Sequence, residues 1–106
     1  MRNLDVSPAA AKDIRGTGHW LRKQYRLTVS LSWTDAMFAA FQKLVHNPEM
    51  HPVAEELDFG EIFFREMIVR RFRGVVYRIL YSFDDTTVTI HRIRNAAQDP
   101  LTEDDF

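Results

Sequence analysis

The 106-residue chain contains no cysteine, which excludes both a disulfide framework and the chemistry of a cysteine thiolate. It has no apolar run that approaches the roughly 20 residues needed to span a bilayer. Its first ten residues, MRNLDVSPAA, lack the apolar stretch of a secretory signal. From these absences we expect a cytoplasmic protein that has no membrane partner.

Several motifs of common enzymes are missing as well. The chain has no glycine-rich phosphate loop, no paired-carboxylate site and no nucleophile elbow, so we predict neither P-loop chemistry nor a cofactor. His46 and His51 flank Glu49 at a spacing that would suit a metal site on a helix. Asn47-Pro48 breaks any helix between them, so we predict that the chain holds no metal.

What is present fits one domain spanning residues 1–106. Hydrophobic residues make up 45% of the chain and charged residues 27%, which suffices for a single packed core. The net charge of −1 conceals a basic stretch from Arg65 to Arg94 that lies between two acid-rich segments. Such a stretch can seat a phosphate backbone or an acidic peptide, and its arginines can equally decorate the solvated face of a sheet.

The chain begins with signals for a strand and then a helix. Asn3–Val6 is expected as an edge strand. Ser7 suits a helix N-cap and Pro8 suits the first helical position, so a helix is predicted to begin there. Gly16 and Gly18 weaken the middle of this helix and can kink or split it.

A second helix is predicted over about Ser32–His46 from apolar residues at helical spacing. Pro48 ends it, because the residue before a proline is pushed out of the helical region. The two helices then form an antiparallel hairpin with one apolar face to cover. The segment over residues 48–60 has no clear period and is expected as a loop.

Three strand-like runs follow: Phe63–Arg70, Val75–Phe83 and Thr87–Arg94. The middle run alternates cleanly between apolar and polar residues, which is typical of a half-buried strand. A β-bulge near Arg92 reconciles the two apolar parities of the last run. The fold class is therefore α+β, with a helical hairpin packed on a small antiparallel sheet in the order β-α-α-β-β-β.

The ordered motifs resemble the RelE/ParE toxin superfamily over nearly the whole chain. Val6–Ile14 resembles the family's opening strand and helix start, and Asn47-Pro48 resembles the family's exit from the second helix. A strand that ends in arginine corresponds to Phe64-Arg65. The two remaining strands resemble VYRILY at Val76–Tyr81 and VTIHRIR at Val88–Arg94. No single motif is strong, and the specificity lies in their order.

The resemblance implies the toxin of a type II toxin–antitoxin pair, as in plasmid stabilisation systems, which inhibits growth until a cognate antitoxin protein binds it. Toxins of the ParE kind bind an essential protein such as DNA gyrase. Toxins of the RelE kind cut mRNA on the ribosome, which would make the chain an endoribonuclease. A third alternative is a homologue that binds an antitoxin but is no longer toxic.

Two departures from the family pattern bear on this choice. Many members carry a histidine and then an arginine after the last strand, where this chain has Asn95 and Gln98. The mRNA-cleaving relatives use a C-terminal arginine and tyrosine, whereas no tyrosine follows Tyr81 here. Both losses favour a target-binding toxin, or a non-toxic homologue, over a nuclease.

Candidate site residues come from the basic stretch. If the chain is a nuclease, the resemblance carries over Arg65 and Arg78 as catalytic cations, and His91 is the only imidazole on the predicted sheet. The competing interpretation of His91 is structural, with one face against the helices and a hydrogen bond. For binding a target or an antitoxin we select Arg65, Arg78, Arg92 and Arg94. We expect the carboxylates of an antitoxin tail to meet Arg65, Arg78 or Arg92.

Aromatic residues offer a last alternative, because they can form a base-stacking platform or a core. Aromatics at helical spacing in so small a chain are more often core, and this is the interpretation we favour. The residues concerned are Trp20, Trp33, Phe38, Phe41, Phe63 and Phe64.

Overall fold

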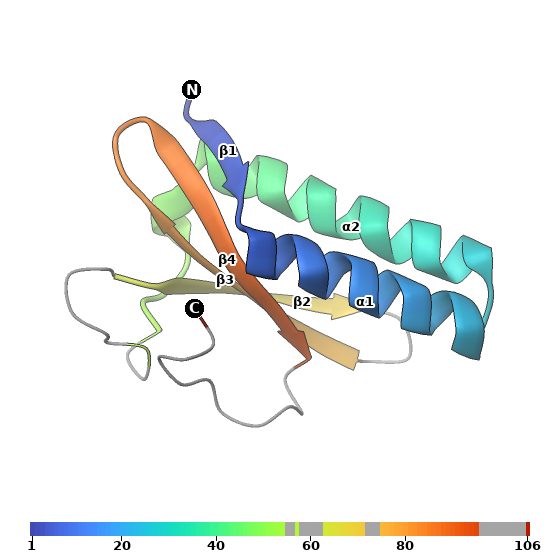
Figure 1. The fold of residues 1–106 in the computed structure, drawn as a ribbon. Helices are drawn as coiled ribbons and strands as arrows, with labels where there is room; N and C mark the ends of the chain where they lie inside the picture. Colours follow the sequence, from blue (N-terminus) through green and yellow to red (C-terminus); the bar gives the residue numbers. More distant parts are fainter. Residues whose placement is uncertain (55–56, 58–62, 72–74, 96–105) are drawn as a thin grey trace.

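The computed structural model describes residues 1–54, 57, 63–71, 75–95 and 106, and Figure 1 shows how they are arranged. In chain order the elements are β1 (Asn3–Val6), α1 (Pro8–Gln24), α2 (Leu27–His46), the 3-10 turn η1 (Pro48–Met50), β2 (Arg65–Arg71), β3 (Val75–Phe83) and β4 (Thr87–Asn95). The order β-α-α-β-β-β and the α+β class are as predicted from the sequence.

The sheet has four strands in the order β1-β4-β3-β2. Strands β2, β3 and β4 form the predicted antiparallel meander. β1 lies parallel to β4, which makes the sheet mixed rather than wholly antiparallel. Parallel neighbours require a long connection between them, and here the helical hairpin together with β2 and β3 supplies it.

Helix α1 starts as the sequence predicts. The Ser7 hydroxyl accepts a hydrogen bond from the Ala10 backbone N–H at 3.0 Å and donates one to the His91 carbonyl at 2.9 Å. One side chain therefore caps the helix and ties its first turn to β4. The helix runs unbroken to Gln24, so the glycines within it neither kink nor split it.

Helix α2 begins at Leu27, ahead of the predicted Ser32, and this boundary was wrong. The reason is a tertiary contact, because the buried Ser30 donates from its hydroxyl to the Gly18 carbonyl at 2.7 Å. A Cβ on Gly18 would lie 3.3 Å from the Ser30 Oγ, so glycine allows the two helices to approach closely here. Arg26 is the N-cap and gives no side-chain cap.

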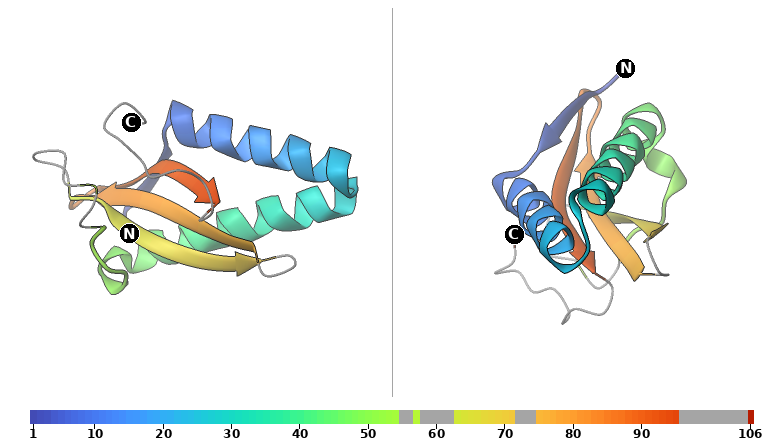
Figure 2. Two further views of the ribbon diagram at one scale, coloured as in Figure 1. Left: turned by 90° about the horizontal axis from the view of Figure 1, so that it is seen from below. Right: turned by 90° about the vertical axis from the view of Figure 1, so that its right-hand side faces the viewer.

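The hairpin covers one face of the sheet, as the views in Figure 2 show, and the main core lies between these two layers. The alternation in β3 is confirmed, since its odd-numbered residues face this core. Its fully buried large side chains include Trp33, Met37, Phe41, Leu44, Ile79, Tyr81 and Ile90. A smaller buried cluster covers part of the outer face of the sheet and consists of Ala54, Leu57, Phe64 and Leu80.

The predicted bulge in the last strand is confirmed. Leu80 pairs with Arg92 while Tyr81 pairs with Ile90, so His91 is the extra residue on β4. This shift lets both Ile90 and Ile93 face the core although their parities differ.

Candidate functional site

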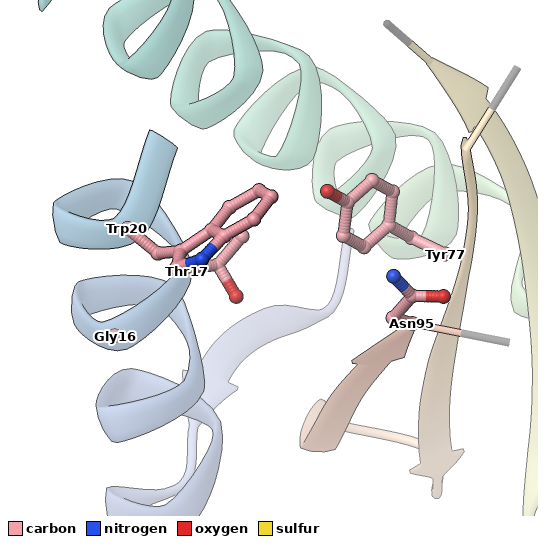
Figure 3. Close-up of a pocket in the computed structure, with 5 residues that line it drawn as sticks. All are labelled: Gly16, Thr17, Trp20, Tyr77 and Asn95. Carbon is pink, nitrogen blue, oxygen red and sulfur yellow. The ribbon is translucent and has the colours of Figure 1, made fainter. Parts of the chain in front are cut away.

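A pocket of about 290 Å³ opens between α1 and the ends of β3 and β4. Figure 3 shows Trp20 and Thr17 on the helix facing Tyr77 and Asn95 on the strands. Gly16 also lines it, and a Cβ at that position would meet nothing within 4 Å. The space beside Gly16 is therefore open, and a larger side chain at this position would enter it.

The walls of the pocket are aromatic. Trp20 is 52% exposed and packs edge-on against Tyr25, with ring centroids 6.0 Å apart. Tyr77 is buried, and its ring centroid lies 5.4 Å from that of Trp33. Burial raises the pKa of Tyr77, and the nearby Tyr25 raises it further. The phenol therefore stays neutral, and the pocket presents apolar rings with hydroxyl and amide groups at its rim.

The outer edge of β2 is a second feature open to a partner. Its first residues are covered, since Val53 bridges Arg65 and the Glu66 N–H donates to the Pro52 carbonyl at 3.0 Å. In the part of the chain that the structure describes, no strand pairs with this edge beyond Glu66. The backbone N–H and C=O groups of Ile68 and Arg70 point away from β3, as those of Glu66 do, because these residues alternate along the strand. Such an edge accepts an added strand.

The predicted site residues do not form one cluster. Arg65 lies near the helix side of β2, where its guanidinium donates to the carbonyls of Glu49 at 3.2 Å and His51 at 2.7 Å. The same group lies 5.5 Å from the centre of the Phe83 ring. Arg65 thus fastens the segment after α2 to the sheet.

Arg92 has a structural role as well. Its guanidinium makes two hydrogen bonds to the Asp13 carboxylate, at 2.7 and 2.9 Å, and both side chains are largely buried. The Ile93 N–H donates to the same carboxylate at 2.9 Å. Asp13 therefore covers the edge of β4 where β1 has ended, and it joins α1 to the sheet.

Arg78 and Arg94 are the two predicted residues that the structure brings together. They are directly opposite each other on β3 and β4. Arg78 lies on the outer face, as its parity predicts, and forms an ion pair with Glu66. Two cations opposite each other on a sheet repel, so this part of the outer face concentrates positive charge.

His91 lies on the outer face and not against the helices, so that part of its structural interpretation was wrong. Its Nε2 is 2.7 Å from the Ser82 hydroxyl, and its ring packs edge-on against Phe64 with centroids 4.9 Å apart. Phe106 packs against the same two rings. Burial lowers the pKa of His91, and the nearby Asp5 carboxylate opposes that shift.

The expectation that the aromatics form the core holds for only some of them. Trp33, Phe41 and Phe64 are buried, whereas Trp20, Phe38 and Phe63 are 52%, 44% and 74% exposed. Sequence reasoning missed the pocket, and the signal that could have found it is the glycine four residues before a tryptophan on one helix. Gln98, which stands where many family members carry an arginine, lies outside the described residues.

Among the described residues, neither a membrane-spanning helix nor a candidate metal cluster is found. None of their helices is long and apolar enough to cross a membrane. No three of their histidine, aspartate or glutamate side chains gather as a metal ion would require.

Residues 4–100 match the sequence model of the family described as the ParE toxin of the type II toxin–antitoxin system, parDE. The match runs from β1 past the end of β4, so it covers the helical hairpin, the whole sheet and the pocket between them. Fold and sequence together define the toxin of a type II toxin–antitoxin system. The chain belongs to the ParE toxin family. A comparison with curated proteins gives no match.

Proposed function

We propose that this toxin slows growth by binding an essential protein, with DNA gyrase the first to test, and that a cognate antitoxin neutralises it. The observation that carries the proposal is the separation of the groups that a nuclease would need. Arg65 is held by backbone carbonyls at the helix side of β2. Arg78 is on the opposite, outer face, where its guanidinium is paired with the Glu66 carboxylate.

Cleavage at a 2′-hydroxyl needs a base, an acid and cations around one phosphate. Arginine cannot supply the proton transfers, because its pKa is above about 12. His91 is therefore the sole proton carrier among the predicted residues, and it lies on the opposite face of the sheet from Arg65. This arrangement supports recognition of a protein over cutting of mRNA.

The antitoxin has a place to anchor in the open pocket. At about 290 Å³ the pocket is smaller than the usual small-molecule site of about 300 to 1,000 Å³. It suits one large apolar side chain of a peptide, set between Trp20 and Tyr77. The free edge of β2 allows the same peptide to add a strand.

Of the four arginines selected from sequence, Arg78 and Arg94 suit the antitoxin's carboxylates best. Both lie on the outer face of the sheet, whereas Arg65 and Arg92 fasten other segments of the chain to the sheet. We therefore assign acidic residues of the antitoxin tail to the outer face.

The target is tested with purified protein. We expect the wild type to inhibit DNA supercoiling by gyrase, while an in vitro translation reaction with the same protein shows no new mRNA cuts. Cuts at defined codons would instead establish the RelE-like alternative. Expression without growth arrest, combined with antitoxin binding, would establish the non-toxic homologue.

The antitoxin pocket is tested with Gly16→Leu, which fills the pocket without a clash at Cβ. Titration of the C-terminal peptide of the adjacent gene's product should give an affinity more than about tenfold weaker than for the wild type. Lys43→Gln, at an exposed position near the other end of the hairpin, is the matched control and should bind as the wild type does. Equal affinity of the Gly16→Leu variant would contradict the assignment.

A further inference from the structure

The helical hairpin projects beyond the sheet at the end where its two helices join, and Figure 2 shows this clearly in its left view. No sheet lies beneath that end, yet four large apolar side chains gather on it. Trp20, Tyr25, Leu27 and Leu31 are 52%, 44%, 49% and 53% exposed. Side chains of this size are more stable when a partner covers their apolar surface. We call this surface the hairpin tip.

The hairpin tip is also strongly basic. Between Asp13 and Asp35 the chain has four cations and no carboxylate. Three of these cations, Arg22, Lys23 and Arg26, belong to the last turn of α1 and the junction with α2, where they stand among the exposed apolar residues. All three are exposed. In contrast to these three cations, the sheet arginines Arg78 and Arg92 have carboxylate partners within the chain.

We propose that the hairpin tip is the surface with which the toxin docks on its target, an acidic protein surface that presents apolar side chains. The inference rests on the proposed function and adds the recognition surface to it. Tryptophan, tyrosine and arginine are the residues most enriched at the energetic centres of protein interfaces, and the tip combines all three. Unpaired cations around that centre complement acidic residues of the partner and speed its association.

Two other occupants fit the tip less well. A second copy of the chain would bring the same cations against each other, which costs free energy at any symmetric contact. A nucleic acid would leave much of the tip's apolar surface without a matching partner, because its backbone is charged. Leu27 and Leu31 offer nothing to a phosphate backbone.

The tip continues into a shallow hollow along α2, with a volume of about 580 Å³. Leu31 and Ala36 give it apolar walls, and Thr28 and Ser32 give it hydroxyl groups. A partner that reaches the tip can therefore extend its contact along the helix.

The tip also shares Trp20 with the pocket assigned to the antitoxin. An antitoxin side chain seated in that pocket contacts a residue of the target surface. Neutralisation then follows from steric competition, and no change in the toxin's conformation is required.

The experiment measures growth arrest on expression of the full chain, using variants that do not line the antitoxin pocket. One variant carries Leu27→Ala and Leu31→Ala, and the other carries Arg22→Gln, Lys23→Gln and Arg26→Gln. Glutamine is chosen because an acidic residue in the last turn of α1 would oppose the helix dipole. Matched controls on the same hairpin are Phe38→Ala, which is equally exposed, and Lys43→Gln.

We expect each tip variant to need more than about tenfold higher expression than the wild type for the same arrest. Both controls should arrest growth at the wild-type level. Circular dichroism and binding of the antitoxin's C-terminal peptide should be unchanged in the tip variants, which excludes unfolding as the cause. Loss of arrest together with retained peptide binding would support the assignment.

Three results would overturn it. Tip variants that arrest growth as strongly as the wild type would refute the tip and leave the proposed function standing. A wild type that causes no arrest would refute the proposed function and the tip with it. If the wild type retarded a DNA or RNA oligonucleotide and the glutamine variant did not, the occupant would be a nucleic acid and not a protein.

Discussion

The two faces of the sheet are covered in different ways. The helix-facing side carries a core of apolar residues from all four strands, and the hairpin covers it. Among the described residues, the buried cluster of the outer side consists of four side chains, and beside them stand charged side chains such as Arg78 and Glu66. The difference shows that the helix side supplies most of the buried apolar contacts in the described residues, whereas the outer side combines a smaller cluster with charged pairs.

The largest effect should come from the helix side. Phe41 is fully buried between the hairpin and the sheet. Phe41→Ala should lower the free energy of unfolding by about 4 kcal/mol, because it leaves a cavity that the packed layers cannot close. Urea denaturation followed by circular dichroism measures this loss. Phe38→Ala, at an exposed position on the same helix, should cost less than about 1 kcal/mol.

A matching truncation on the outer side should cost less. Leu80 is fully buried, and in the part of the chain that the structure describes its cluster holds three other buried residues, fewer than the main core, so we expect it to relax around the gap. Leu80→Ala should lower the free energy of unfolding by about 2 to 3 kcal/mol, at the lower end for a buried leucine. A loss equal to that of Phe41→Ala would mean that the outer cluster is as rigid as the main core.

Asp13 connects the helical hairpin to the sheet. It lies on α1, and its carboxylate accepts hydrogen bonds from the Arg92 guanidinium and from the Ile93 N–H of β4. Asp13→Asn removes the negative charge beside a largely buried guanidinium and should cost about 2 kcal/mol. The same urea titration measures it. In the double variant with Arg92→Met, the loss should be smaller than the sum of the single losses, because the cation left without a partner is gone. Additive losses would contradict the coupling.

Such long-range partners mark the limit of sequence reasoning. The Ser7-Pro8 start, the Asn47-Pro48 exit and the bulge beside Arg92 were predictable because each depends on neighbouring residues. The early start of α2 was not, since it depends on Ser30 meeting Gly18 across the hairpin. The roles of Arg65 and Arg92 were missed for the same reason, because their acceptors come from segments far away in the chain.

At Arg78, on the outer side, the effect of a substitution on stability can be compared with its effect on binding. Its ion pair with Glu66 is partly exposed, so Arg78→Ala should cost less than about 1 kcal/mol in the free energy of unfolding. Binding of the antitoxin's C-terminal peptide should weaken by more, and the loss should shrink as salt is raised. Peptide titration at two ionic strengths measures both effects. If the affinity changes neither with the substitution nor with the salt concentration, Arg78 is not part of the binding surface.

The smallest effect is a pH dependence at His91, the one imidazole on the outer side of the described sheet. Because burial lowers the pKa of His91 below its usual 6.5, the fold favours the neutral ring. As pH falls below about 6.5, the unfolded chain takes up a proton that the folded protein does not, so stability decreases until pH passes the lowered pKa of the folded state. His91→Gln should abolish this part of the decrease, measured as the melting temperature between pH 7 and pH 5. His19→Gln, at an exposed position on α1, is the matched control and should keep the wild-type slope. If the His91→Gln variant loses stability over this range as steeply as the wild type does, the outer side of the sheet does not hold the ring in its neutral form.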